Sequence, residues 1–165
     1  MLFTMAILLC LNISAKKKAP AKKAEGFVFT TIKENPITSI KNQNRSGTCW
    51  SYSGLGFFEA ELLREGRGTH NLSPAFVQNH TMMDRAINFV RLHGHAPMSE
   101  GGSFYDVVYC LRNYGIVPTD VYKGLEYGDS LPNTGELVKL MTAYTDALVK
   151  DDPLKFSTVL INRFQ

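Results

Sequence analysis

Residues 42–50 combine the side-chain types that acyl-transfer chemistry requires. Cys49 stands where a polar, glycine-containing loop changes into a largely apolar segment, and that change predicts the start of a helix. Unpaired backbone N–H groups and the positive end of the helix dipole favour the thiolate form of a cysteine at such a position. We therefore predict that Cys49 is a nucleophile that attacks an acyl carbon.

A nucleophile of this kind also needs hydrogen-bond donors for the oxygen anion that develops during attack. Gln43 lies upstream on the same loop and can fold back to supply its side-chain amide. The backbone N–H of Cys49 would be the second donor, and Gly47 would let the chain make a tight approach. Trp50 is expected to cover the site and to anchor the helix. The alternative for Gln43 is an ordinary loop amide.

Four predicted helices would position these residues. The first runs over residues 49–64, is apolar on most faces, and contains small residues such as Gly54 and Gly56 that allow close packing. The second has Ser73 as its N-cap and Pro74 at its first position. Side chains of a buried stripe then recur at spacings of three and four, namely Phe76, His80, Met83, Ile87 and Val90.

The third predicted helix begins with a capping box formed by Ser103 and Asp106, and it ends before Gly115. The fourth spans residues 135–150. Its inward-facing side chains are predicted to be Leu137, Leu140, Met141, Tyr144 and Leu148. Residues 27–32 are β-branched and aromatic, a composition that predicts a short strand.

The amino-terminal segment differs in composition from the rest. Residues 1–15 contain a short apolar run followed by small residues, which predicts a signal peptide and export to the periplasm or the cell exterior. The cytoplasm is the alternative. This run is too short for a stable membrane span. Residues 16–26 read as a Lys/Ala-rich linker, and residues 27–165 as the folded domain.

The net charge lies almost entirely in that segment. The whole chain carries +3, and residues 1–25, with five lysines and one glutamate, carry +4, which leaves −1 for the remainder. A nearly neutral body offers no electrostatic surface for nucleic acid, so no such partner is expected.

Removal of Cys10 with the signal peptide would leave Cys49 and Cys110. A disulfide between these two is the alternative to a free nucleophile. Cys110 lies on an apolar stripe and is predicted to be a core residue. His80 is expected to be a hydrogen-bonded core histidine. The spacing of histidines and cysteines predicts no zinc site, and no cofactor is expected.

The nucleophile loop resembles a known family. Gln43 and the run SGTCWSYS at residues 46–53 resemble the nucleophile signature of papain-like cysteine peptidases. Residues 72–74, 101–104 and 113–117 resemble further segments of the same family, and the matching region covers residues 35–150.

The resemblance also points to one branch of the family. Secreted papain relatives carry a cysteine pair where this chain has Ser46 and Glu100. Residues 83–86 and 90–94 instead resemble bleomycin hydrolase and bacterial aminopeptidase C.

Several expectations follow from the resemblance alone. It implies an α+β papain-like fold in which this chain forms mostly the helical left domain, with Gly101, Gly102 and Trp50 lining the substrate cleft. The β-rich right domain, with the catalytic His and Asn, would be missing, so the chain is expected to be a fragment or a truncated gene product. A peptide substrate, aminopeptidase action and a hexamer are implied as well. The rival interpretations are an inactive remnant that binds peptides or a partner, and a redox-active thiol protein.

Overall fold

The computed structural model describes residues 26–126, 128 and 130–151. The predicted signal peptide, and the predicted linker as far as residue 25, lie outside the described residues. The chain divides into two units, Met1–Lys33 and Glu34–Gln165, and every described helix belongs to the second unit.

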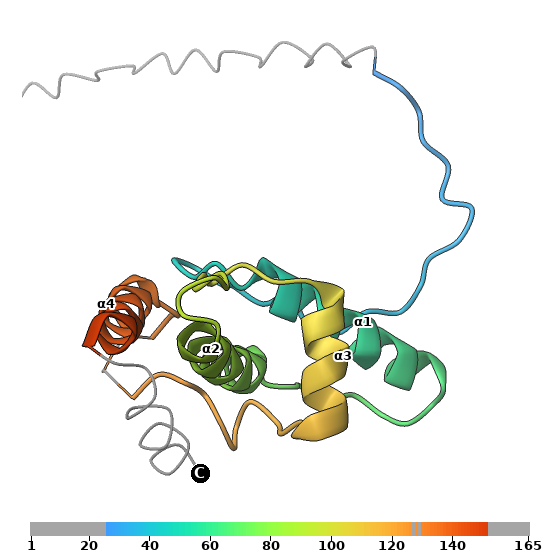
Figure 1. Cartoon of the computed structure of the whole chain (residues 1–165). Helices are drawn as coiled ribbons and strands as arrows, with labels where there is room; N and C mark the ends of the chain where they lie inside the picture. Colours follow the sequence, from blue (N-terminus) through green and yellow to red (C-terminus); the bar gives the residue numbers. More distant parts are fainter. Residues whose placement is uncertain (1–25, 127, 129, 152–165) are drawn as a thin grey trace, which may run out of the picture. The chain divides into compact units, whose positions relative to one another are not determined.

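Four helices follow one another along the chain (Figure 1): α1 (Cys49–Arg64), α2 (Pro74–Arg91), α3 (Phe104–Asn113) and α4 (Gly135–Asp151). They confirm the four helices predicted from the sequence. None of them is long and apolar enough to cross a membrane, as far as the described residues extend.

Local capping explains where α2 and α3 begin. The Ser73 hydroxyl oxygen accepts a hydrogen bond from the Phe76 backbone N–H at 3.1 Å, and Pro74 occupies the first position of α2. The Asp106 carboxylate accepts a hydrogen bond from the Ser103 backbone N–H at 2.7 Å, so the capping box predicted for α3 forms.

The β-type backbone pairing among the described residues is limited to two isolated bridges, between Arg45 and Asn133 and between Leu72 and Pro118. The strand predicted for residues 27–32 is wrong, because no ladder partner pairs with this segment and an extended chain without a partner is not a strand. The described part therefore consists of helices and irregular segments, without a strand.

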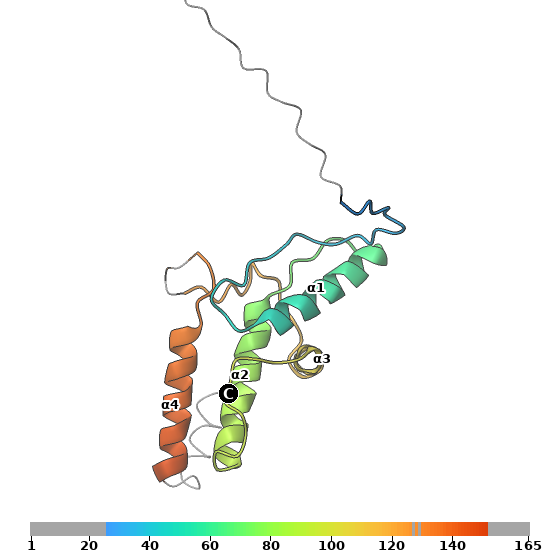
Figure 2. The same ribbon diagram turned by 90° about the horizontal axis from the view of Figure 1, so that it is seen from above.

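α2 is the central helix of the second unit. It contacts α1, α3 and α4, and α1 in turn packs against α3. Figure 2 shows α2 and α4 side by side. The main core lies among α1, α2 and α3, and its buried members are Trp50, Leu55, Leu72, Val77, Val107 and Cys110. Val90 and Leu148 join α2 to α4 in a smaller cluster.

The buried face of α2 differs from the predicted one. Its buried residues include Val77, Thr81, Met82 and Ala86, while the predicted stripe is only half-buried except for Val90. The observed and predicted faces differ because α2 packs on three helices at once. The spacing of apolar residues alone therefore does not determine which side of α2 is most buried.

The predicted face of α4 is largely wrong. Leu140 is 62% exposed, and Leu137 and Tyr144 are also exposed, whereas Thr145 and Leu148 are buried. Of the four described helices, α4 packs only on α2, so its apolar side chains outnumber the partners available to cover them.

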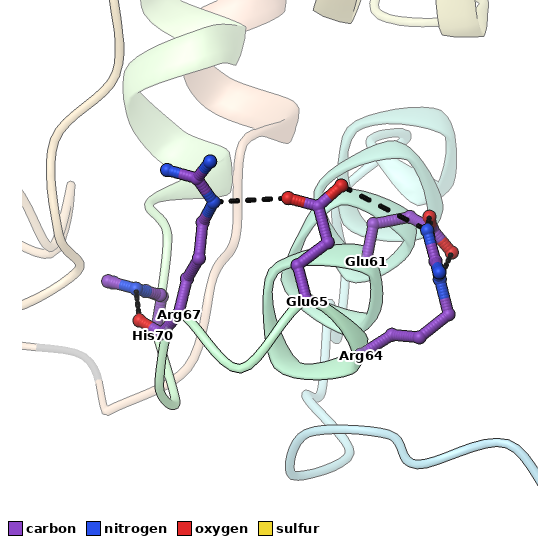
Figure 3. Close-up of polar contacts among 5 residues, drawn as sticks. All are labelled: Glu61, Arg64, Glu65, Arg67 and His70. Carbon is purple, nitrogen blue, oxygen red and sulfur yellow. Dashed lines mark hydrogen bonds and ion pairs between the residues drawn. The ribbon is translucent and has the colours of Figure 1, made fainter.

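The carboxyl-terminal end of α1 carries exposed ion pairs, shown in Figure 3. Arg64 bonds to Glu61 at 2.7 Å, and Arg67 bonds to Glu65 at 3.0 Å. The Arg64 guanidinium lowers the pKa of the Glu61 carboxyl. Because these side chains are exposed, their pairs add little to stability. Glu59, two residues before Glu61, is the buried glutamate of this helix.

Candidate active site

Cys49 is the first residue of α1, and its side chain is exposed. Thr48 is the N-cap, but its side chain makes no capping hydrogen bond to the helix. The Thr48 hydroxyl instead pairs with the Ser46 hydroxyl at 2.6 Å. The first turn of α1 therefore has no side-chain cap, and the thiol lies at the positive end of the helix dipole.

The loop before Cys49 is held by its own side chains. The Gln43 amide donates to the Ser46 carbonyl oxygen at 2.9 Å, and the Ser46 hydroxyl donates to the Gln43 carbonyl oxygen at 2.9 Å. Gln43 thus folds back along the loop toward the residues before Cys49. Its role as an oxyanion donor stays a prediction.

Residues 132–134 support the same loop from outside. The Arg45 backbone N–H donates to the Pro132 carbonyl oxygen at 3.2 Å, and the Arg45 carbonyl oxygen accepts from the Thr134 N–H at 3.3 Å. Asn44, in a left-handed conformation with φ of 47°, donates its amide to Pro132 at 3.0 Å. These long-range contacts leave no trace in the local sequence pattern.

Glu100 also supports the loop before Cys49. The sequence pattern indicates it only as the position where secreted papain relatives carry a cysteine. Its carboxylate accepts hydrogen bonds from the Gln78 amide at 2.9 Å and from the Thr134 hydroxyl. A Cβ atom added to Gly47 would lie 3.0 Å from the same carboxylate. Glu100 therefore connects α2 to the segment before α4 through hydrogen bonds, and its carboxylate lies close to Gly47 in the loop before Cys49.

Trp50 joins α1 to the glycine pair at residues 101 and 102. Its indole N–H donates to the Glu100 carbonyl oxygen at 3.0 Å, and the ring is buried. A Cβ atom added to Gly102 would lie 2.6 Å from the Trp50 ring, while one added to Gly101 would meet nothing within 4 Å. Trp50 anchors α1 as predicted, and the contact requires glycine at position 102.

A pocket of about 390 Å³ opens beside the thiol. Its lining residues are Cys49, Tyr52, Ser53, Gly56 and Glu59 of α1, with Ile37, Thr38, Ser39, Ile40 and Lys41. Neither Gln43 nor the glycine pair lines it, so Cys49 alone of the predicted site residues does. No group of three or more potential metal ligands gathers among the described residues.

A buried carboxylate holds the wall of this pocket in place. Glu59 is fully buried and forms an ion pair with Lys41. It also accepts hydrogen bonds from the Thr38 hydroxyl and the Leu72 backbone N–H, each at 2.6 Å. The sequence pattern does not distinguish Glu59 from Glu61 as the buried glutamate of α1. The structure shows that Glu59 is buried and that Glu61 is not.

A second group of titratable side chains lies between α2 and α3. Burial raises the pKa of the Cys110 thiol to about 11. A hydrogen bond to Asp84 at 2.6 Å, together with burial, raises the pKa of the Tyr114 hydroxyl. His80 stacks on the Tyr114 ring and meets the Phe76 ring edge-on, and burial lowers its pKa. Among the described residues, none forms the hydrogen bond predicted for His80, which is half-buried.

Cys49 and Cys110 are both free, so the structure does not contain the disulfide considered as an alternative. Cys110 belongs to the main core, which confirms its prediction as a core residue.

The chain is similar to two curated cysteine peptidases. It is 25% identical over 127 residues to "Cysteine proteinase 1, mitochondrial" of Saccharomyces cerevisiae, a match that covers 67% of this chain and 26% of the yeast protein. It is 27% identical over 90 residues to "Cathepsin J" of Rattus norvegicus, covering 54% of this chain and 24% of that protein. The chain thus spans about a quarter of the length of these relatives.

No protein-family model matches the chain. The two likenesses, at low identity, support a relation to papain-like cysteine peptidases and nothing finer. The helical architecture is compatible with a helical domain of such an enzyme. The yeast relative is named as mitochondrial, which does not decide between export and the cytoplasm for this chain.

Proposed function

We propose that this chain is the nucleophile-bearing left part of a papain-like cysteine peptidase, with the Cys49 thiolate attacking the carbonyl carbon of a peptide bond. The observation that carries the proposal is the exposed sulfur at the first residue of α1, beside a pocket and without a side-chain cap on the helix. That position leaves the sulfur open to attack an acyl group bound in the pocket.

In the proposed reaction a bond forms between the Cys49 sulfur and the carbonyl carbon, the peptide C–N bond breaks, and the amine leaves with a proton. Water then releases the acyl group and restores the thiol. The Gln43 amide and the Cys49 backbone N–H would hold the oxygen anion.

The proposed reaction needs an imidazole to exchange protons with the sulfur and the leaving amine. All four histidines of the chain lie in the described part, and none lines the Cys49 pocket. We therefore assign the catalytic histidine, and the asparagine that would orient it, to polypeptide outside these 165 residues.

The finer parts of the proposal rest on the sequence resemblance to bleomycin hydrolase and aminopeptidase C. They are cleavage from peptide amino termini, substrate contact at Gly101, Gly102 and Trp50, hexamer formation, and export directed by residues 1–15. Similarity to a yeast cysteine proteinase supports the peptidase class to which these details belong.

Labelling with a peptidyl epoxide tests the proposal. The chain is expressed alone and together with any coding sequence that follows its Gln165 codon, and labelled peptides are mapped by mass spectrometry. We expect Cys49 to be labelled in the longer polypeptide only, because the epoxide needs the imidazole-activated thiolate. Cys49→Ser is the control and should remain unlabelled.

Two other results would contradict the proposal. Absence of labelling in both polypeptides would favour the inactive, peptide-binding remnant. Reversible oxidation of Cys49 coupled to Cys110 would favour a redox protein, although the burial of Cys110 argues against it.

A further inference from the structure

Residues 99–102 are held by an unusual set of contacts to their carbonyl groups. Arg85 Nη1 donates to the Ser99 carbonyl oxygen at 2.6 Å and also to the Gly101 carbonyl oxygen. The Glu100 carbonyl oxygen between them accepts from the Trp50 indole N–H. Three successive carbonyls are thus bound by two side chains from neighbouring helices, which fixes the orientation of the segment.

Besides the two carbonyl groups, Arg85 contacts an aromatic ring and a carboxylate. Its guanidinium carbon lies 5.9 Å from the centre of the Trp50 ring, and its Nη2 atom lies 3.4 Å from the Asp106 carboxylate. Asp106 forms the capping box at the start of α3, and only 18% of the Arg85 side chain is exposed. The guanidinium uses one nitrogen for both carbonyls and a second for Asp106, while its planar face lies near the Trp50 ring, a combination that an ammonium group cannot reproduce.

These contacts leave the next residue with its main chain unused. Neither the N–H nor the C=O of Gly102 forms a hydrogen bond with another described residue. An extended peptide is recognised through main-chain hydrogen bonds of this kind. The orientation of both groups follows from that of residues 99–101, because these are bonded directly to Gly102.

We propose that Arg85 is a positioning residue, which bridges the Ser99 and Gly101 carbonyls so that the Gly102 main chain is presented to the extended peptide that Cys49 would attack. This inference rests on the proposed function, because it takes a peptide as the ligand. Arg85 touches neither the peptide nor the sulfur, and acts only through the glycine segment.

Two thiol reagents that differ only in a peptide group test the proposal on the full chain. Iodoacetamide reports on the thiol, and a dipeptide carrying the same iodoacetyl group reports on thiol and peptide binding together. The variants are Arg85→Met, Arg85→Lys and the control Arg91→Met. Arg91 lies on the same helix, is exposed, and has no partner among the described residues. Peptide mapping separates Cys49 from the other two cysteines.

We expect Arg85→Met to slow the reaction of Cys49 with the peptide reagent about tenfold, because the charge-assisted hydrogen bonds from Arg85 to the two carbonyls are lost. The iodoacetamide rate should change less than about twofold, since the thiol keeps its own contacts. Arg85→Lys should fall between, because an ammonium can donate to the carbonyls but loses the Asp106 contact and the planar face near Trp50. Arg91→Met should match the unmodified chain with both reagents.

Trp50 is the only tryptophan and provides an independent signal. Its fluorescence should shift, and its quenching by acrylamide should increase, in Arg85→Met but not in Arg91→Met. Circular dichroism reports on helix content. Where Arg85→Met loses helix content, Arg85→Lys decides the question with the same two reagents.

Two outcomes overturn the assignment. The first is an unchanged peptide-reagent rate in folded Arg85→Met, and the second is an equal loss with both reagents, which indicates a structural role only. A different failure belongs to the proposed function. If the unmodified chain shows no preference for the peptide reagent over iodoacetamide, the peptide ligand is wrong, while Trp50 fluorescence still tests the contact with Arg85.

Discussion

Cys49 and Cys110 differ in what surrounds their sulfur atoms. The Cys49 sulfur is exposed at the start of α1, next to backbone N–H groups. The Cys110 sulfur is enclosed in the core, where burial, assisted by the charge of Asp84, raises its pKa from 9.0 to about 11. Burial disfavours the charged thiolate, so Cys110 is suited to packing rather than to reaction.

The raised pKa of Cys110 predicts a loss of stability in alkali. The unfolded chain releases this proton near pH 9, and the folded chain only near pH 11. The contribution is therefore fully present below about pH 9 and is lost as the pH rises toward 11. Urea titrations across this range should show a shallower decline in unfolding free energy for Cys110→Ala. Equal slopes in both proteins would contradict the raised pKa.

At the scale of elements, α1 and α3 approach closely at one glycine. A Cβ atom added to Gly54 would lie 2.8 Å from a methyl carbon of Val107, whereas one added to Gly56 would meet nothing within 4 Å. Both glycines are in the same helix, so they carry the same penalty in helix propensity. Only Gly54 has a packing role that offsets this penalty.

Alanine substitutions at these two positions should therefore have opposite effects. Gly54→Ala should lower the unfolding free energy by about 1–3 kcal/mol, because α1 and α3 must separate to admit the methyl group. Gly56→Ala should raise it by roughly 0.5–1 kcal/mol through helix propensity. Urea denaturation followed by circular dichroism measures both. A stabilising Gly54→Ala would show that the helices are less tightly packed than described.

The same contrast between local and distant information explains which predictions succeeded. The helix starts at Ser73 and Ser103 depend on neighbouring residues, and both were predicted correctly. The exposed side of α4, including Leu140, depends on which helices cover it, and periodicity does not contain that information. The position of Cys49 followed from its own motif. The contacts that Arg85 and Thr134 make with residues 100 and 101 join distant segments, and the local pattern does not predict them.

At the scale of the whole second unit, Glu59 joins three separate stretches of chain. It binds Lys41 and Thr38 on the amino-terminal side, and the Leu72 N–H on the segment before α2. Lys41 also donates to the Leu72 carbonyl oxygen at 3.2 Å. One carboxylate thus ties the pocket wall and the entry to α2 to the central part of α1, and its loss should weaken all of these contacts together.

Glu59→Gln should lower the unfolding free energy by about 3 kcal/mol, because it leaves the Lys41 charge without its buried partner. The matched control is Glu61→Gln, which removes an exposed pair with Arg64 and should change stability by less than about 1 kcal/mol. Urea denaturation measures both variants. Similar values for the two would mean that Lys41 finds water or another partner when Glu59 is neutral.

Gly102 lies so close to the Trp50 indole that no other residue fits there. Under the proposed function, the surface that meets the substrate at this point consists of main chain alone, and main chain is the same in every peptide. Choice among substrate sequences must then be made by other parts of the enzyme. An engineer who wished to alter that choice would leave position 102 untouched and work elsewhere.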